Sequence, residues 1–493
     1  MTPDNQENNT LRKGAIKSFS WSYAEKIATQ LVSFVLSIIL ARLLAPEDYG
    51  KLSLVHIFTT IMSAIALTGF GSALIQRKDT TDIDYSTTLI FSFGVAVAAY
   101  LVLFFGAPLF SLIFSENITP YLRVSSLSMV ISSINTVLHA RVIRALKFQR
   151  LFIASICGVL VSAAVGICMA YNGFGVWALV AQHVTSTLVN TVVSAFLCGW
   201  KIKLRFSLQS VKKIYSFGWK LTVSSALDAV YRQLRSLVIG KKYTSTDLAY
   251  YDRGLQYPNL IINNVDTSIA SVLVPVLSRK QDDLPGLKKM VIRGVKTSSV
   301  ILFPLLIGLA VCAEPIVLLM LTEKWLPCVP YLQVLSIALM FKPIQTANLQ
   351  GILAIGRSDI YLKIQMTQKL IGVATIAITI LCFSTPFAVA LGELVAYLLF
   401  ACVNAYPNKK YLNYSIKEQI TNLLPQLTVA GLMGGLVYLI GSLQINTLLL
   451  LILQVLSGAA FYIGVMYIFK VDAFMYLWKM LLAFLKKFRK KAQ

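Results

Sequence analysis

The sequence predicts an all-α, polytopic integral membrane protein of about fourteen transmembrane helices. Apolar segments near the roughly 20 residues that cross a bilayer recur along almost the whole chain, and no sizeable soluble domain separates them. Of the 493 residues, 57% are hydrophobic and 13% are charged. The segments are about twice the length of a membrane β-strand and lack its alternation, which argues against a β-barrel.

Each expected helix is one apolar segment bounded by a polar or charged loop. In chain order the segments cover 16–40, 50–73, 86–113, 121–140, 151–171, 176–198, 216–239, 256–277, 292–312, 328–354, 362–382, 386–406, 423–441 and 447–469. Two segments are atypical: 216–239 carries several charges, and 328–354 contains Pro330 and Pro343. Pro343, which has polar residues around it, predicts a kink in this segment.

The distribution of lysine and arginine predicts the topology. With a cytoplasmic N-terminus, 31 of the 45 lysines and arginines fall in inside loops and the tail, against 6 in outside loops. This bias predicts an even number of spans with both ends in the cytoplasm. It also accounts for the net charge of +24 without a nucleic-acid partner, because anionic lipid attracts such a face.

Both ends of the chain fit this topology. The polar, then basic start leads into an apolar run too long for a signal peptide, so we expect a retained first span. The stretch 471–493 mixes aromatic residues with lysines and predicts a basic amphipathic cytoplasmic tail. An interfacial helix and a simple stop-transfer tail are both compatible with it.

The sequence has no motif of an enzyme, metal site or nucleotide site. The seven cysteines form no CxxC pair, and His56, His139 and His183 are isolated, although one histidine could couple protons. Without an ATP site, transport would draw on an Na⁺ or H⁺ gradient, the membrane potential or the gradient of the substrate itself. We therefore expect a non-enzymatic transporter without a cofactor.

A weak internal repeat indicates two halves in the same orientation. Ser18–Trp21 opens the first span as Ser216–Trp219 opens the seventh, and Arg77–Asp79 follows the second span as Arg279–Asp282 follows the eighth. Because six spans separate the matched stretches, the halves would be parallel lobes with a substrate path between them. Two unrelated basic loops are the alternative.

Charged side chains inside the spans are the candidate site, because intramembrane charge usually faces a cavity or a partner. Asp228, Arg232 and Arg235 fall on one helical stripe, where Asp228 could pair with Arg232 and leave Arg235 freer. A cationic cavity would suit an anionic substrate. The candidate cations are Lys26, Arg232, Arg235, Lys342 and Lys369, and the acids that could pair with them or bind a coupling ion are Glu25, Asp228, Asp266 and Glu393. Structural salt bridges are the alternative for each residue.

Several stretches carry a resemblance to a known family. They are Ala41–Gly50 after the first span, Arg144–Arg150, Asn172–Val180, Tyr250–Gly254 and Leu353–Arg357. With these stretches in this order, the chain resembles the Wzx-like polysaccharide flippases of the multidrug/oligosaccharidyl-lipid/polysaccharide exporter superfamily. Members of this family move O-antigen, capsule or exopolysaccharide repeat units. The resemblance runs from about Gly14 to about Pro407.

The resemblance implies a domain organisation and a function. It implies two pseudo-symmetric six-helix lobes, 1–200 and 201–410, two appended spans over 411–470, and the tail 471–493. The substrate would be a polyprenyl-pyrophosphate-linked oligosaccharide, flipped by alternating access across the bacterial cytoplasmic membrane. Glu25 and Lys26 fall where relatives that move cell-wall lipid precursors keep charged residues. Lys26, Arg232 and Arg235 would hold the pyrophosphate, and Asn263, Asn264, Gln345 and Asn348 would contact sugars.

Partners and alternatives follow from the same resemblance. The partners would be the lipid-linked oligosaccharide, membrane lipids, a polysaccharide polymerase and a chain-length regulator, with the protein acting as a monomer. The alternatives are a multidrug exporter or a peptidoglycan-precursor exporter of the same superfamily, and a membrane glycan polymerase. Short outside loops argue against the polymerase, and the excess of cations argues against a cavity for cationic drugs.

Overall fold

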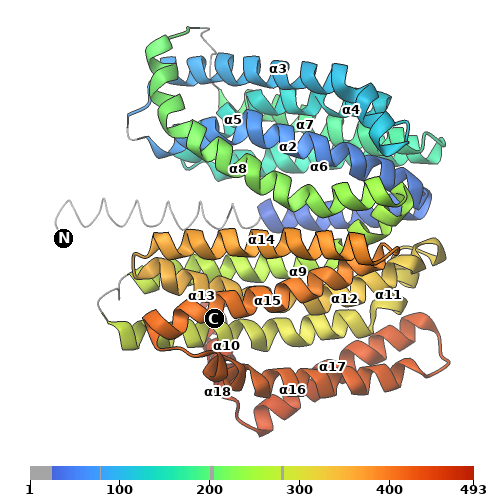
Figure 1. The fold of residues 1–493 in the computed structure, drawn as a ribbon, viewed down its shortest axis with the longest axis vertical. Helices are drawn as coiled ribbons and strands as arrows, with labels where there is room; N and C mark the ends of the chain where they lie inside the picture. The colour runs from blue at the N-terminus through green and yellow to red at the C-terminus, as the bar shows by residue number, and fades with distance from the viewer. Residues whose placement is uncertain (1–20, 22–24, 78, 200–204, 279–282, 493) are drawn as a thin grey trace. The chain divides into compact units, whose positions relative to one another are not determined.

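The computed structural model describes residues 21, 25–77, 79–199, 205–278 and 283–492 (Figure 1). Over these ranges the chain is helical and contains no strand, which confirms the predicted all-α class. The start of the first expected span, Ser18–Ser20 of the repeat, Lys78 and the stretch 279–282 lie outside the described residues.

The described helices follow the expected segments closely. Their bounds are Glu25–Leu43, α2 Pro46–Gln76, α3 Asp82–Phe114, α4 Thr119–Ser125, α5 Leu127–Arg144, α6 Phe148–Tyr171, α7 Val176–Cys198, α8 Leu208–Lys242, α9 Ser245–Ser278, α10 Leu284–Val311, α11 Ala313–Met320, the 3₁₀ helix η1 Glu323–Cys328, α12 Val329–Leu339, α13 Lys342–Ala354, α14 Ser358–Cys382, α15 Phe387–Leu412, α16 Ile416–Gly441, α17 Thr447–Ile468 and α18 Asp472–Ala492.

Twelve helical stretches in the described ranges are long and apolar enough to cross a membrane, so the protein is a multi-pass membrane protein. α4 with α5 forms one of them, and η1 with α12 and α13 forms another. The expected fourteen spans included α8 and α9, which are long but carry too much polar sequence to be among the twelve.

Local sequence explains where the helices begin and break. Thr81 caps α3 by accepting a hydrogen bond from the Asp84 amide, while the Asp84 carboxylate accepts one from the Thr81 amide at 2.9 Å. Pro343 lies in the first turn of α13, where its missing N–H costs nothing, so the chain breaks between α12 and α13. The helix is thus interrupted next to Pro343, where the sequence predicted a kink.

By its contacts the chain divides into two compact units, residues 1–249 and 250–493. In the first unit α2 packs on α3, α5 and α8, and α6 packs on α7. In the second unit α10 packs on α13 and α16, α14 on α15, and α16 on α17. The division falls after Ala249, so α8, which packs on α2 and α3, belongs to the first unit.

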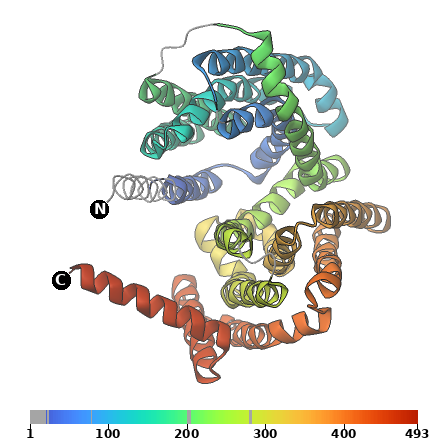
Figure 2. The same ribbon diagram turned by 90° about the vertical axis from the view of Figure 1, so that its left-hand side faces the viewer.

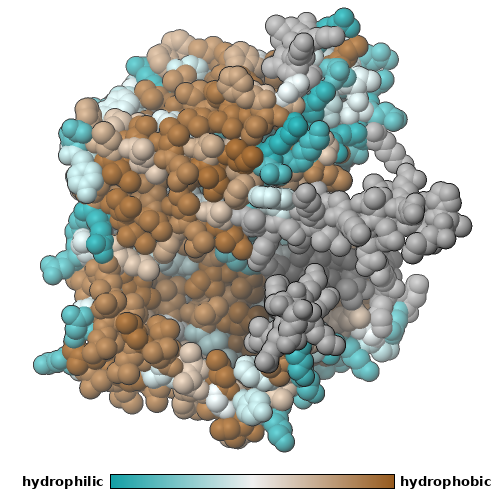
Figure 3. All heavy atoms as spheres, turned by 180° about the vertical axis from the view of Figure 1, so that it is seen from behind, coloured by the Kyte–Doolittle hydropathy of each residue, from teal (hydrophilic) through white to brown (hydrophobic). Residues whose placement is uncertain are grey.

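The surface of each unit matches a bilayer environment. In Figure 3 the visible side chains over the middle of the helices are hydrophobic, and hydrophilic residues gather towards the helix ends. Large apolar side chains are widely exposed, as with Phe196 at 82% and Leu381 at 84%. Such exposure is expected where lipid replaces water as the neighbour.

The last helix runs in a different direction from the helices on which it packs. Figure 2 shows α18 lengthwise while many of the other helices of the second unit are seen end-on. α18 contacts α10 and α17, and the Arg293 guanidinium of α10 lies 4.2 Å from the centre of the Tyr476 ring. Phe474 is buried at 8% exposure. The interfacial helix is the alternative that this arrangement favours for the tail.

Candidate functional site

In the first unit, Glu25 begins a chain of polar side chains that joins four helices. The Ser155 hydroxyl of α6 donates to Glu25 Oε1 at 2.7 Å, and Asn190 Nδ2 of α7 donates to Ser155 Oγ at 3.3 Å. Asn135 Nδ2 of α5 donates to Asn190 Oδ1 at 3.0 Å. A carboxyl group tied into such a network within a membrane can hold a proton or a cation. The sequence pointed to Glu25 as a charge inside a span, but not to Ser155, Asn190 and Asn135, whose signal is only a polar residue inside an apolar span.

The histidines are not all isolated. The imidazoles of His56 on α2 and His183 on α7 lie 5.1 Å apart, edge to face. The expectation of three isolated histidines was therefore wrong for this pair, because residues 127 positions apart are brought together by packing of α2 on α7.

The three charged residues predicted on one stripe lie on α8 in the first unit. Arg235 is buried at 8% exposure, whereas Arg232 is exposed. Arg232 Nε donates to the backbone carbonyl of Asp228 at 3.3 Å, so this bond reaches the main chain and not the Asp228 carboxylate. Lys26 is exposed on the helix Glu25–Leu43. Of these cations, Arg235 is the one that the protein encloses.

In the second unit, Glu393 of α15 is buried and hydrogen-bonded. The Tyr251 hydroxyl of α9 donates to Glu393 Oε2 at 2.6 Å, and the two residues are 1% and 5% exposed. A carboxyl group held this way needs its hydrogen bond, since its alternative inside the bilayer is an unsatisfied polar atom. Tyr251 belongs to the stretch Tyr250–Gly254 that carried the family resemblance.

The structure brings two other predicted residues together. Asp266 of α9 interacts with the Thr346 hydroxyl of α13 and lies close enough to Lys342 for their charges to attract. Asn264 Nδ2 donates to the Leu260 carbonyl of its own helix at 2.8 Å, and Asn263 is exposed. Lys369 is half-buried on α14. The five predicted residues Asn263, Asn264, Asp266, Lys342 and Lys369 belong to the second unit. The predicted residues of the first unit are Glu25, Lys26, Asp228, Arg232 and Arg235.

Two residues expected to contact sugars are used to hold helices together. Asn348 is fully buried, and its Nδ2 donates to Gln419 Oε1 of α16 at 2.8 Å. Gln345 is 7% exposed and donates to the Tyr397 carbonyl of α15 at 3.2 Å. Buried amides bonded across helices are typical packing elements in membrane proteins.

Arg253 also differs from its expected place. The sequence put it in an outside loop, but α9 begins at Ser245, so Arg253 lies inside the helix and is only 5% exposed. Its Nη1 donates to Gln256 Oε1 at 2.7 Å, and its guanidinium lies 4.8 Å from the centre of the Trp325 ring. A desolvated arginine over an indole face is a strong local contact.

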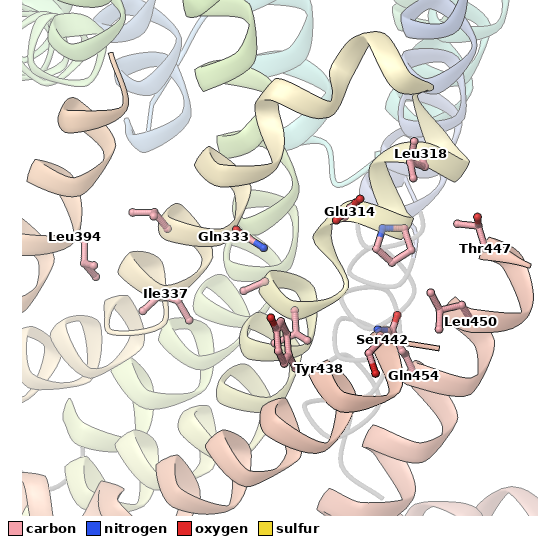
Figure 4. Close-up of a pocket in the computed structure, with 15 residues that line it drawn as sticks. Glu314, Leu318, Gln333, Ile337, Leu394, Tyr438, Ser442, Thr447, Leu450 and Gln454 are labelled. Atoms are coloured by element: carbon pink, nitrogen blue, oxygen red, sulfur yellow. The ribbon is translucent and has the colours of Figure 1, made fainter. Parts of the chain in front are cut away.

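A cavity of about 690 Å³ lies in the second unit between the α10–α12 region and α16 with α17 (Figure 4). Its walls are mainly apolar, and Glu314 is the charged residue among those that line it. Gln454 lines it at 2% exposure and donates Nε2 to the Val437 carbonyl at 3.2 Å. None of the residues predicted to form the site lines this cavity.

The chain is similar in sequence to known polysaccharide biosynthesis proteins. The family model described as "Polysaccharide biosynthesis protein" matches residues 39–330. The succinoglycan biosynthesis transport protein ExoT of Rhizobium meliloti is 24% identical over 66% of either chain. The lipopolysaccharide biosynthesis protein WzxC of Escherichia coli is 23% identical over 86% of this chain and 88% of its own.

A solved structure has a similar fold. The lipid II flippase MurJ in its inward closed conformation aligns with a TM-score of 0.75, covering 92% of this chain and 99% of its own. The two sequences are 15% identical, so the similarity is one of fold.

Proposed function

We propose that this chain, which belongs to the polysaccharide biosynthesis protein family, is a flippase for lipid-linked oligosaccharides. It moves polyprenyl-pyrophosphate-linked repeat units from the cytoplasmic to the outer leaflet by alternating access. The observation that carries the proposal is the family match over residues 39–330, more than half of the chain. The two relatives are named for different glycans, so we infer that the feature recognised in common is the lipid pyrophosphate linkage.

The charged residues inside the helices supply the chemistry that this substrate needs. A pyrophosphate leaving water requires compensating cations and hydrogen-bond donors. Arg235, which is buried, can grip two phosphate oxygens with its planar guanidinium, and Lys26, Arg232, Lys342 and Lys369 add positive charge. Asn263 and Asn264 offer amides to the sugars. No covalent bond is made or broken in this transport, so no residue has a catalytic role.

The acids would couple the cycle to an ion gradient. Glu25 accepts a hydrogen bond from Ser155, and Asp266 lies close to Lys342. Each carboxylate can give up this contact and bind a proton or an Na⁺ ion in its place. Asp228 and Glu393 are further positions for ion coupling or for pairing with a cation. An ion that binds one conformation better shifts the population towards it, which drives alternating access.

The proposed setting is the bacterial cytoplasmic membrane. The excess of lysine and arginine in alternate loops supports cytoplasmic N- and C-termini. A polysaccharide polymerase and a chain-length regulator would use the exported units, and one chain would transport as a monomer.

The experiment is deletion of the gene followed by mass spectrometry of the extracted polyprenyl-pyrophosphate lipids. We expect a completed, unpolymerised repeat unit to build up on the cytoplasmic side, and its mass would identify the sugars. Build-up of the peptidoglycan precursor would transfer the assignment to that substrate. An unchanged lipid pool with altered drug sensitivity would indicate a drug exporter, and units already on the outer leaflet would indicate a polymerase.

A further inference from the structure

A second cavity, of about 570 Å³, lies in the second unit between α10, α16, α17 and the start of α18. Most of its lining is apolar and includes Leu432 of α16 and Val465 of α17. Three charged residues also line it: Lys296 of α10, Lys470 and Asp472. The cavity thus offers both apolar walls and charged groups to an amphiphile, and the residues predicted to bind the transported substrate do not line it.

Lys296 and Lys470 are the cationic groups that line this cavity. Lys296 is half-buried and Lys470 is exposed, and among the described residues neither forms an ion pair with a carboxylate. The Thr421 and Thr428 hydroxyls, which also line the cavity, donate to the carbonyls of Lys417 and Leu424. With one acid, Asp472, against two lysines, the lining has a net positive charge.

We propose that this cavity binds an anionic phospholipid of the surrounding bilayer. Lys296 and Lys470 contact the phosphate, and the acyl chains extend along Leu432 and Val465 into the hydrocarbon. A half-buried ammonium group next to apolar walls is costly without a counter-charge, and a phosphate at the membrane surface supplies it. Basic pockets between transmembrane helices on the cytoplasmic side are suited to anionic headgroups. The bound lipid would fix α18, whose first residues line the cavity, against α10 and α17.

The test is native mass spectrometry of the full-length protein, delipidated in detergent and titrated with phosphatidylglycerol or phosphatidylcholine of the same chain length. We expect phosphatidylglycerol to bind the wild type at least about tenfold more tightly, and Lys296→Gln/Lys470→Gln to lose most of this preference. Lys363→Gln/Lys409→Gln removes the same charge on α14 and α15, outside the cavity, and should keep the preference. Glu314→Gln, in the other cavity, should also keep it.

Three results would overturn the proposal. They are equal binding of the two lipids to the wild type, an unchanged preference in Lys296→Gln/Lys470→Gln, and an equal loss in Lys363→Gln/Lys409→Gln. If the double variant fails to elute as a folded species, Lys470→Gln alone is used, because this side chain is exposed and its replacement removes no buried contact. It should lower the preference about threefold or more, and an unchanged value would contradict the proposal.

Discussion

At the scale of single residues, Arg235 is the cation on α8 that is most enclosed, at 8% exposure. We expect Arg235→Glu to reduce export to background with a normal level of protein in the membrane, because a carboxylate would repel the pyrophosphate. Arg235→Lys should keep part of the activity, since it retains the charge but not the two-pronged contact. The readout is the amount of polymerised surface glycan.

The matched control for Arg235 is Lys212→Glu, which reverses an exposed charge near the start of the same helix. It should export normally. Full export by Arg235→Glu would remove this residue from the substrate path.

The bond between Tyr251 and Glu393 gives a second prediction for single residues. Tyr251→Phe removes one hydroxyl from a fully buried contact of 2.6 Å, and we expect it to lower the free energy of unfolding by about 1–3 kcal/mol. The measurement is the unfolding midpoint of the purified protein in detergent. Tyr406→Phe, at a side chain that is 74% exposed, should leave the midpoint unchanged. Equal midpoints for Tyr251→Phe and wild type would show that the bond adds no stability.

At the scale of elements, glycine explains why α8 packs on α2. A Cβ added at Gly69 of α2 would lie 2.4 Å from the Gly218 carbonyl oxygen of α8. The two backbones therefore touch where both residues lack a side chain, as small residues permit between membrane helices. We expect Gly69→Leu to force the helices apart at a cost of about 1–3 kcal/mol or more, read as a lower unfolding midpoint.

The matched control for Gly69 is Gly94→Leu on α3, where an added Cβ meets nothing within 4 Å. Its side chain should enter open space without loss of stability. A lowered midpoint for both variants would mean that leucine disturbs these helices irrespective of their packing.

The helices of this protein are more predictable from its sequence than the contacts between them. Most helices were found to within a few residues, because a span of about 20 apolar residues is a local property. The packing of α8 on α2 was not predicted, because it depends on the close approach of Gly69 and Gly218, which are 149 positions apart in the sequence. Charge inside the spans singled out Glu25, Asp266 and Lys342 as candidates, but the sequence did not predict that Asn348 would bond Gln419. Which polar residues bond across helices depends on tertiary packing that periodicity does not encode.

At the scale of the whole molecule, the number of spans depends on α8 and α9. α8 runs beside α3 from one end to the other: near its start the Ser207 amide donates to Thr87 Oγ1 at 3.1 Å, and near its end Lys241 Nζ donates to the Ile113 carbonyl. Just after it, the Ser245 hydroxyl donates to Glu116 Oε1 at 2.6 Å. Because α3 is long and apolar enough to span, a helix that accompanies it over this length must cross the same layer. This geometry favours a crossing by α8 despite its polar sequence.

A crossing by α8 places the turn between α8 and α9 on the outer surface. We therefore expect a single cysteine at Lys242, in a chain whose seven native cysteines are replaced, to react with a membrane-impermeant maleimide on intact cells. The same fourteen-span topology predicts labelling at Ser442, between α16 and α17, and labelling at Lys410, near the end of α15, only after permeabilisation. If neither α8 nor α9 crosses, the count falls by two and the termini stay where they are, but Lys242→Cys then reacts only after permeabilisation. The site at Lys242 thus separates fourteen spans from twelve, which a reporter at either terminus cannot do because both counts are even.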